Sequence, residues 1–136
     1  MQTSPELGTI IAAWYASWES VANGDSSWAD RYLSRRAELH TVGSDPNEVF
    51  EGDKAFEHMK QEMKAMGGLK FSSGEIKAYQ EGSVGWGIAR PTVILPNGKQ
   101  VSFRWNAVFH QEDGEWKLMQ FHASVGVPNE QLLRQE

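Results

Sequence analysis

The chain has 136 residues, which suits a single domain over 1–136, and its formal net charge is −5. Its 13 Lys and Arg residues are scattered and form no patch that would neutralise phosphates, so no nucleic-acid partner is expected. It contains no Cys, no apolar run long enough to cross a membrane and no secretory-type N-terminus, so thiol chemistry and membrane partners are excluded and a cytoplasmic location is expected.

The first part of the chain is predicted to form helices. Ser4, Pro5 and Glu6 are typical of a helix start, because Ser caps, Pro fits the first turn and Glu favours the positive helix end. Apolar residues then recur at helical spacing: Leu7, Ile11, Trp14, Trp18 and Val21. Asn23-Gly24-Asp25 is expected to end this helix, and a short second helix follows around Trp28.

A strand over 37–42 and a third helix are predicted next. Gly43-Ser44-Asp45-Pro46 ends the strand, because Pro disfavours helical geometry in the residue before it. Asp53 is placed to cap the third helix, and Gly67-Gly68 is expected to end it. The apolar stripe of this helix is formed by Phe56, Met59 and Met63.

Four strands joined by tight turns are predicted for the rest of the chain, over 71–80, 84–95, 101–111 and 116–127. Asn97-Gly98 and Asp113-Gly114 between apolar runs are strong hairpin signals. Pro91 predicts an edge, a bulge or a break within its strand, and Gly85 and Gly87 predict a bend or the close approach of another element. Helices followed by antiparallel strands indicate an α+β fold.

Four segments carry a resemblance to a known family. They are Gly24-Asp25, Gly43-Ser44-Asp45-Pro46 leading to Glu51-Gly52, Glu81-Gly82-Ser83-Val84-Gly85-Trp86, and the run from Trp116 to Ser124. Together with the helical start they resemble SnoaL-like proteins of the nuclear transport factor 2-like superfamily. The resemblance implies a cone-like curved sheet, antiparallel or mixed, packed by three N-terminal helices around a pocket in a cystatin-like roll. It also implies a homodimer, because members usually pair through their sheets.

This resemblance leaves the activity open. Members of the superfamily include ketosteroid isomerases, polyketide cyclases, epoxide hydrolases, dehydratases and non-catalytic assembly domains, and a shared fold is a weak guide to activity. The final strand is also similar to the final strand of the calcium/calmodulin-dependent kinase association domain. No Asp or Glu lies inside the strands over 84–95 and 101–111, so the buried acid of the isomerases has no match.

The final hairpin allows two registers. A three-residue Glu112-Asp113-Gly114 loop with Gly114 left-handed, which we favour, opposes Arg104 to His122. A two-residue Asp113-Gly114 turn slips the pairing by one residue and opposes His122 to Trp105.

In the favoured register one face of this hairpin is polar. It carries Arg104, Asn106, Gln120, His122 and Ser124. If this face lines a pocket, Arg104 and Asn106 would hold a carboxylate or enolate oxygen and His122 would transfer a proton. In the alternative, the opposite apolar face forms the core and the polar face meets water or a partner chain.

Further candidates come from the first strand and from the aromatic residues. By its position, the resemblance suggests His40 as a second proton carrier, near the carboxylate base of ketosteroid isomerases. Trp14, Tyr15, Trp18 and Trp86 are predicted to bind substrate, with plain core packing as the alternative for the tryptophans.

No metal or other cofactor is expected. His58 and Glu62 stand one helical turn apart, where they would clip a metal or pair in water, but no second ligand set accompanies them. Two functional hypotheses follow. The first is a cofactor-free acid–base enzyme, such as an isomerase, cyclase or dehydratase, acting on a small apolar carbonyl or carboxylate compound. The second is a non-catalytic ligand-binding or assembly domain.

Overall fold

A computed structural model describes residues 1–19, 26–65 and 69–134 as an α+β fold, as predicted. The strands are β1 (Gln2–Thr3), β2 (His40–Val42), β3 (Val49–Glu51), β4 (Lys70–Ser72), β5 (Ile76–Glu81), β6 (Val84–Ala89), β7 (Thr92–Ile94), β8 (Gln100–Ser102), β9 (Arg104–Glu112) and β10 (Glu115–Ser124). The helices are α1 (Pro5–Glu19), α2 (Ser27–Tyr32), α3 (Gly52–Ala65) and α4 (Asn129–Leu132). None of these described helices is long and apolar enough to cross a bilayer.

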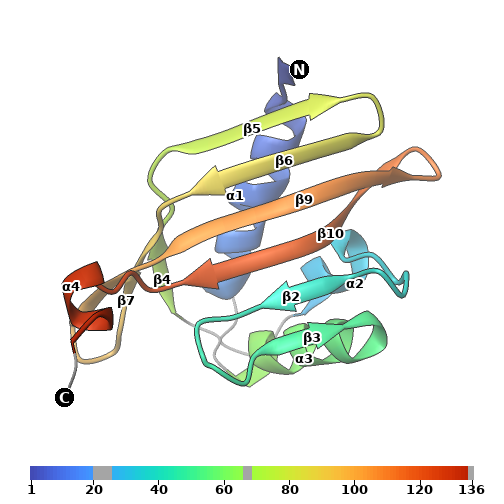
Figure 1. Ribbon diagram of the computed structural model, residues 1–136. Helices are drawn as coiled ribbons and strands as arrows, with labels where there is room; N and C mark the ends of the chain where they lie inside the picture. The colour runs from blue at the N-terminus through green and yellow to red at the C-terminus, as the bar shows by residue number, and fades with distance from the viewer. Residues whose placement is uncertain (20–25, 66–68, 135–136) are drawn as a thin grey trace.

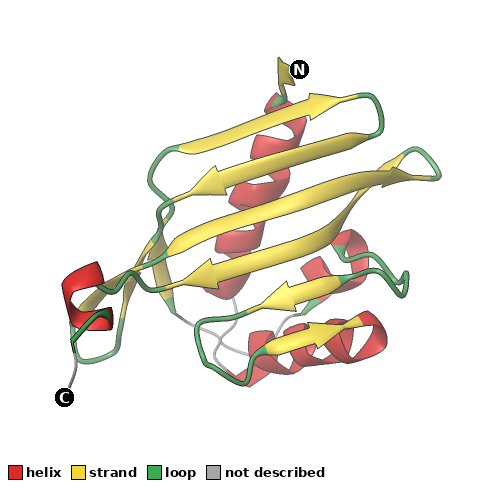
Figure 2. Cartoon of the chain, in the orientation of Figure 1, coloured by secondary structure: helices red, strands yellow, loops and turns green. Residues whose placement is uncertain are grey.

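The strands form two sheets. The large sheet has the order β1-β5-β6-β9-β10-β2-β3, and the small sheet has the order β4-β7-β8. Neighbours in the large sheet are antiparallel except β2 and β10, which are parallel, so the sheet is mixed. Helices α1, α2 and α3 lie on one side of the large sheet, and α1 runs across its strands (Figures 1 and 2). We call the helix side the inner face and the opposite side, which faces the viewer in Figure 1, the open face.

Helix α1 is held closely against the inner face. Ser4 caps it as predicted, since the Leu7 backbone N–H donates to the Ser4 hydroxyl at 3.2 Å. A Cβ atom at Gly85 would lie 2.3 Å from Leu7 Cδ1, and one at Gly87 would lie 2.3 Å from Ile11 Cδ1. Of the two alternatives predicted for these glycines, a bend or the close approach of another element, the structure shows the close approach, and the element is α1.

The final hairpin departs from both registers considered for the sequence. Its turn is the two-residue Asp113-Gly114, and both residues have positive φ, at 53° and 82°. The register then shifts between Leu118 and Gln120, with Met119 as the extra residue of a bulge. His122 consequently lies opposite Asn106, so the pairings with Arg104 and with Trp105 are both wrong.

Three long predicted strands are interrupted. Gly74 at φ 63° separates β4 from β5. Pro91 separates β6 from β7, so of the edge, bulge or break predicted there the structure shows a break. Phe103 separates β8 from β9, and its N–H donates to the Pro91 carbonyl at 2.8 Å. The breaks free β4, β7 and β8 to form the small sheet.

Some boundaries also differ from prediction. Asp53 does not cap α3, because the helix begins at Gly52 and Asp53 lies in its first turn. Strands β1 and β3 were not predicted from the sequence. The predicted helix ends at 23–25 and 67–68 lie outside the described residues.

Candidate functional site

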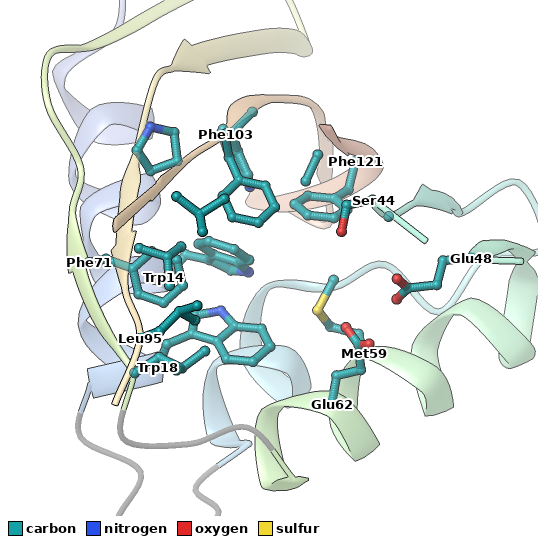
Figure 3. A pocket seen from close by; sticks show the side chains of 17 residues that line it. Trp14, Trp18, Ser44, Glu48, Met59, Glu62, Phe71, Leu95, Phe103 and Phe121 are labelled. Atoms are coloured by element: carbon teal, nitrogen blue, oxygen red, sulfur yellow. The ribbon is translucent and has the colours of Figure 1, made fainter. Parts of the chain in front are cut away.

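A largely apolar cavity of about 220 Å³ opens between α1, α3, the inner face of β9 and β10, and the small sheet. It exceeds the roughly 150 Å³ of an apolar cavity that accommodates benzene. Its lining residues are Trp14, Trp18, Gly43, Ser44, Glu48, Met59, Glu62, Leu69, Phe71, Pro91, Val93, Leu95, Val101, Phe103, Trp105, Phe121 and Ala123. Trp14, Trp18, Phe71 and Leu95 lie on one side of the cavity, across from Glu48, Met59 and Glu62 (Figure 3).

Tryptophans form much of one wall. The Trp14 ring centroid lies 5.5 Å from that of Trp18 and 5.5 Å from that of Trp105. All three side chains are buried, and among the described residues none of their indole N–H groups has a hydrogen-bond acceptor. Their nitrogen atoms are enclosed by neighbouring atoms, so the aromatic wall presents an apolar surface to the cavity.

Two carboxyl groups and one imidazole lie opposite this wall. Glu62 is on α3, one helical turn after His58, and Glu48 comes from the loop between β2 and β3. His58 Nε2 lies 3.6 Å from Glu48 Oε2 and 3.6 Å from Glu62 Oε1. The His58 ring stacks on Phe50 with centroids 4.2 Å apart, which fixes its orientation between the two acids.

The environment of Glu62 favours its protonated form. Burial, a side-chain hydrogen bond to Glu48 and the negative charges of Glu48 and Asp45 raise the pKa of Glu62 from 4.5 to about 8. Glu48 accepts a hydrogen bond from the Asp45 backbone N–H at 3.1 Å. Near neutral pH Glu62 therefore keeps a proton at the edge of the cavity.

The backbone near Glu48 is shaped to admit its side chain. The Gly43 N–H donates to the Glu48 carbonyl at 2.8 Å, which closes the loop between β2 and β3. A Cβ atom at Gly43 would lie 2.8 Å from Glu48 Cδ and 2.9 Å from Oε2. The absence of a side chain at Gly43 therefore leaves room for the carboxyl group beside Glu62.

Glu48, His58 and Glu62 also form a possible metal-binding group. Each offers one ligand atom, and these atoms lie within 4.8 Å of one another. Carboxylate oxygens and imidazole nitrogen are ligands that zinc accepts. Such an ion would compete with the proton that Glu62 and Glu48 share, because metal ligands must be deprotonated.

The predicted polar cluster lies outside this cavity. Arg104, Asn106 and His122 are exposed on the open face, and Arg104 Nε donates to Ser124 Oγ at 3.2 Å. The expectation that they line the pocket is therefore wrong. The cavity instead uses the inner face of the same strands, through Trp105, Phe121 and Ala123. The alternative orientation, with the polar face outward, matches the structure.

The other candidates are divided between the cavity and the rest of the molecule. Trp14 and Trp18 line the cavity, as their predicted role requires. Tyr15 is buried beside Trp14 but is not part of the lining, and its burial raises the pKa of its phenol. Trp86 lies on the open face, 37% exposed. His40 is also exposed and pairs with Glu51 at 3.2 Å, so it does not reach the cavity.

Sequence reasoning did not select the Glu48–Glu62 pair. One signal was present, because Glu62 follows Met59 by three residues and so lies on the apolar stripe of α3. A charged residue on such a stripe indicates a special environment. Nothing local indicated Glu48, which reaches Glu62 only through the packing of its loop.

A curved mixed sheet with helices on one face and an apolar cavity between them defines an α+β roll of the nuclear transport factor 2-like and cystatin-like kind. The chain belongs to the SnoaL-like domain family, whose model matches residues 8–128. A comparison with curated protein sequences gives no match.

Solved structures support the same fold. A nuclear transport factor 2-like protein of unknown function from Pseudomonas putida is 14% identical, with a TM-score of 0.75 over 93% of this chain and 88% of that chain. A provisionally named dehydratase from Streptomyces avermitilis is 17% identical, with a TM-score of 0.73 over 90% of this chain and 95% of that chain. A provisionally named ketosteroid isomerase from Shewanella frigidimarina is 16% identical, with a TM-score of 0.68 over 86% of this chain and 93% of that chain. At these identities the likeness shows the fold alone.

Proposed function

We propose that the protein is a cofactor-free acid–base enzyme acting on a small, mostly apolar carbonyl or carboxylate compound bound in the cavity. The observation that carries this proposal is the half-buried Glu62–Glu48 carboxyl pair at the edge of an apolar cavity. A carboxyl group whose pKa is raised, placed beside a second carboxyl group, can supply an acid and a base in one site. The provisional names of two structural neighbours, a dehydratase and a ketosteroid isomerase, belong to reactions of this kind.

The carboxyl pair suits proton transfer at carbon next to a carbonyl group. Glu48 would accept the proton, and the C–H electron pair would move into an enolate whose oxygen carries the developing negative charge. Protonated Glu62 would return a proton at another carbon in an isomerisation, or to a departing hydroxyl group in a dehydration. His58, 27% exposed and in reach of both acids, would exchange protons with solvent.

Deuterium exchange tests this proposal without knowledge of the natural substrate. Small cyclic ketones such as 2-indanone and 2-tetralone are incubated with the protein in D₂O, and loss of their α-protons is followed by NMR. We expect Glu62→Gln to lower the protein-catalysed rate by about 10²-fold or more, the usual contribution of a positioned acid or base. Glu57→Gln, an exposed change on the same helix, is the matched control. An equal rate in wild type and Glu62→Gln would refute the role of Glu62.

An assembly role is the second candidate, and the open face favours it. Val84, Trp86 and Ile88 are large apolar residues of β6 that are exposed by 47%, 37% and 44%. Tyr79 of β5 packs beside Trp86 with ring centroids 4.9 Å apart. We infer that this surface pairs two copies of the chain into a homodimer, with Arg104 and His122 at or near the contact.

The homodimer proposal is tested by sedimentation of the wild-type protein and of Trp86→Glu. We expect a dimer mass at micromolar concentration for wild type and a monomer mass for the variant, since the change buries a charge at the contact. A wild-type monomer would contradict the proposal. Catalysis and pairing are compatible, because the cavity and the open face lie on opposite sides of the sheet.

A further inference from the structure

A second and much smaller cavity adjoins the one described above. Its volume is about 20 Å³, which exceeds the roughly 10–15 Å³ that one water molecule needs. Glu48, Met59 and Glu62 line both cavities, so the smaller cavity lies beside the carboxyl pair that Figure 3 shows at the edge of the larger one. We call the smaller cavity the side cavity. It has room for one water molecule and none for an organic ligand.

The side cavity has a partly polar lining. Its polar side chains are those of Thr41, Glu48, His58 and Glu62. One atom each of the two acids and of His58 lie within 4.8 Å of one another, so an atom placed between them is within about 2.8 Å of all three, a hydrogen-bond distance. His58 Nε2 lies 3.6 Å from an oxygen of each acid, a separation that a bridging water can close. A water molecule in the side cavity therefore meets the two to four polar partners that buried waters have.

The hydroxyl group of Thr41 is an independent sign of a bound molecule. Thr41 is 4% exposed, its side chain lines the side cavity, and among the described residues its hydroxyl has no hydrogen-bond partner. Ser4 and Ser34 are as deeply buried, and their hydroxyls are hydrogen-bonded, one to the Leu7 backbone N–H and the other to Glu112. Buried polar groups usually have a partner, and a water in the side cavity would be one for Thr41.

We propose that the side cavity binds a single water molecule through its four polar side chains, at the edge of the substrate cavity. The role of this water rests on the proposed function, because it is taken as a product of the reaction there. Of isomerisation and dehydration, only dehydration releases a water molecule, so the side cavity selects dehydration. The substrate is then a β-hydroxy carbonyl compound with an apolar body.

The reaction balances without a further reactant. Glu48 takes the proton from the carbon next to the carbonyl group, and the C–H electron pair passes through the enolate into a new C=C bond. The C–O bond to the β-hydroxyl group breaks, and the hydroxyl takes the proton of Glu62 and leaves as water. This water enters the side cavity, where the Thr41 hydroxyl binds it. His58, 3.6 Å from both acids, returns the proton from Glu48 to Glu62.

Two ketones that differ by one hydroxyl group separate this inference from the proposed function. 3-Hydroxycyclohexanone loses water to form 2-cyclohexenone, which is followed by its ultraviolet absorbance. Cyclohexanone has no leaving group and only exchanges its α-protons, which is followed by NMR in D₂O. Thr41→Val keeps the shape of the side chain and removes the hydroxyl. We expect it to lower kcat for dehydration at least about fivefold, the value of one hydrogen bond, and to leave exchange into cyclohexanone unchanged. Thr41→Ser, the matched control, keeps the hydroxyl and should stay close to the wild-type rate of dehydration.

A crystal structure observes the site without any activity. In the wild type we expect one water molecule within about 3.2 Å of the Thr41 hydroxyl and of at least one carboxyl oxygen of the pair. In Thr41→Val we expect no water at this position. Thermal unfolding verifies that both Thr41 variants are folded, and the wild-type crystal tests the water site even where a variant does not fold.

Several results would overturn the inference. They are a wild-type crystal with no water at Thr41, a metal ion there identified by anomalous scattering, equal dehydration rates in wild type and Thr41→Val, or no dehydration of 3-hydroxycyclohexanone by the wild type. The proposed function fails separately. If Glu62→Gln abolishes deuterium exchange while Thr41→Val dehydrates at the wild-type rate, the acid–base role stands and the role of the water is lost. If the water is present in the crystal but exchange does not depend on Glu62, the binding site stands and the acid–base role is lost.

Discussion

Replacing Glu62 with Gln should change how the stability of the protein depends on pH. Gln mimics the protonated carboxyl in size and polarity and cannot ionise. In the wild type, the pKa of Glu62 rises from 4.5 to about 8 on folding. Between these values the folded state holds one proton more than the unfolded state, so the free energy of unfolding falls as pH rises. The contribution is complete below pH 4.5 and is lost as pH rises through 8.

The magnitude follows from linkage. One bound proton gives a slope of at most about 1.4 kcal/mol per pH unit. Because the side chain of Glu62 is 33% exposed and water screens its charge, we expect a total loss of about 2 kcal/mol between pH 5 and pH 8, well below the unscreened limit. Glu62→Gln should therefore match the wild type near pH 5 and exceed it by about 2 kcal/mol at pH 8.

Urea unfolding at pH intervals from 5 to 9 measures this difference. Other groups titrate in the same range, so the quantity to follow is the free energy of unfolding of Glu62→Gln minus that of wild type. Glu57→Gln, on the exposed side of the same helix, should give a difference that does not change with pH. A flat difference for Glu62→Gln as well would refute the reasoning, because Glu62 would then ionise like an exposed acid and store no proton at neutral pH.

Four further predictions concern this site and the packing of α1. Gly43→Ala places a Cβ 2.8 Å from Glu48 Cδ, so it should displace that carboxyl, lower the pKa of Glu62 and flatten the pH dependence measured above. Gly85→Ala brings a Cβ within 2.9 Å of the Tyr79 carbonyl oxygen and should cost about 2 kcal/mol in urea unfolding. Gly8→Ala, with nothing within 4 Å in the α1 interior, should instead stabilise by roughly 0.5–1 kcal/mol, and a loss there would contradict the account of α1 packing. Deuterium exchange should be unchanged after treatment with a chelator; loss of exchange that Zn²⁺ restores would show a metal-assisted route through Glu48, His58 and Glu62.

Local signals in the sequence predicted local structure well. Ser4 caps α1, Pro91 breaks its strand, and Asp113-Gly114 forms a turn with positive φ at both residues. The register beyond this turn was not predictable, because the bulge at Met119 has no local signature. The bulge moves the pairing by one residue and so returns the polar residues to a common face, although neither considered register was correct throughout.

Only one member of the Glu48–Glu62 pair could be recognised from the sequence. Glu62 interrupts the apolar stripe of α3, which a helical pattern can reveal. Glu48 lies in a loop, and its approach to Glu62 depends on the docking of β2, β3 and α3, which sequence spacing does not encode. The raised pKa of Glu62 is a property of this pairing together with burial, so it arises only in the folded protein.

The prediction of the site depended on which face of the sheet lines the cavity. Two glycines, Gly85 and Gly87, bear on that question. Gly85 and Gly87 alternate with Trp86, and their lack of side chains predicts that another element approaches that face. Gly87 lies opposite Ala107 and Gly85 opposite Phe109, so the approached face is the one that carries Trp105. Helix α1 packs against this face, so Arg104, Asn106 and His122 lie on the open face. The proton chemistry that we propose therefore involves Glu62 of α3 in place of these residues. The glycine positions identify the inner face as the cavity side only together with the β6–β9 pairing, which forms in the folded sheet.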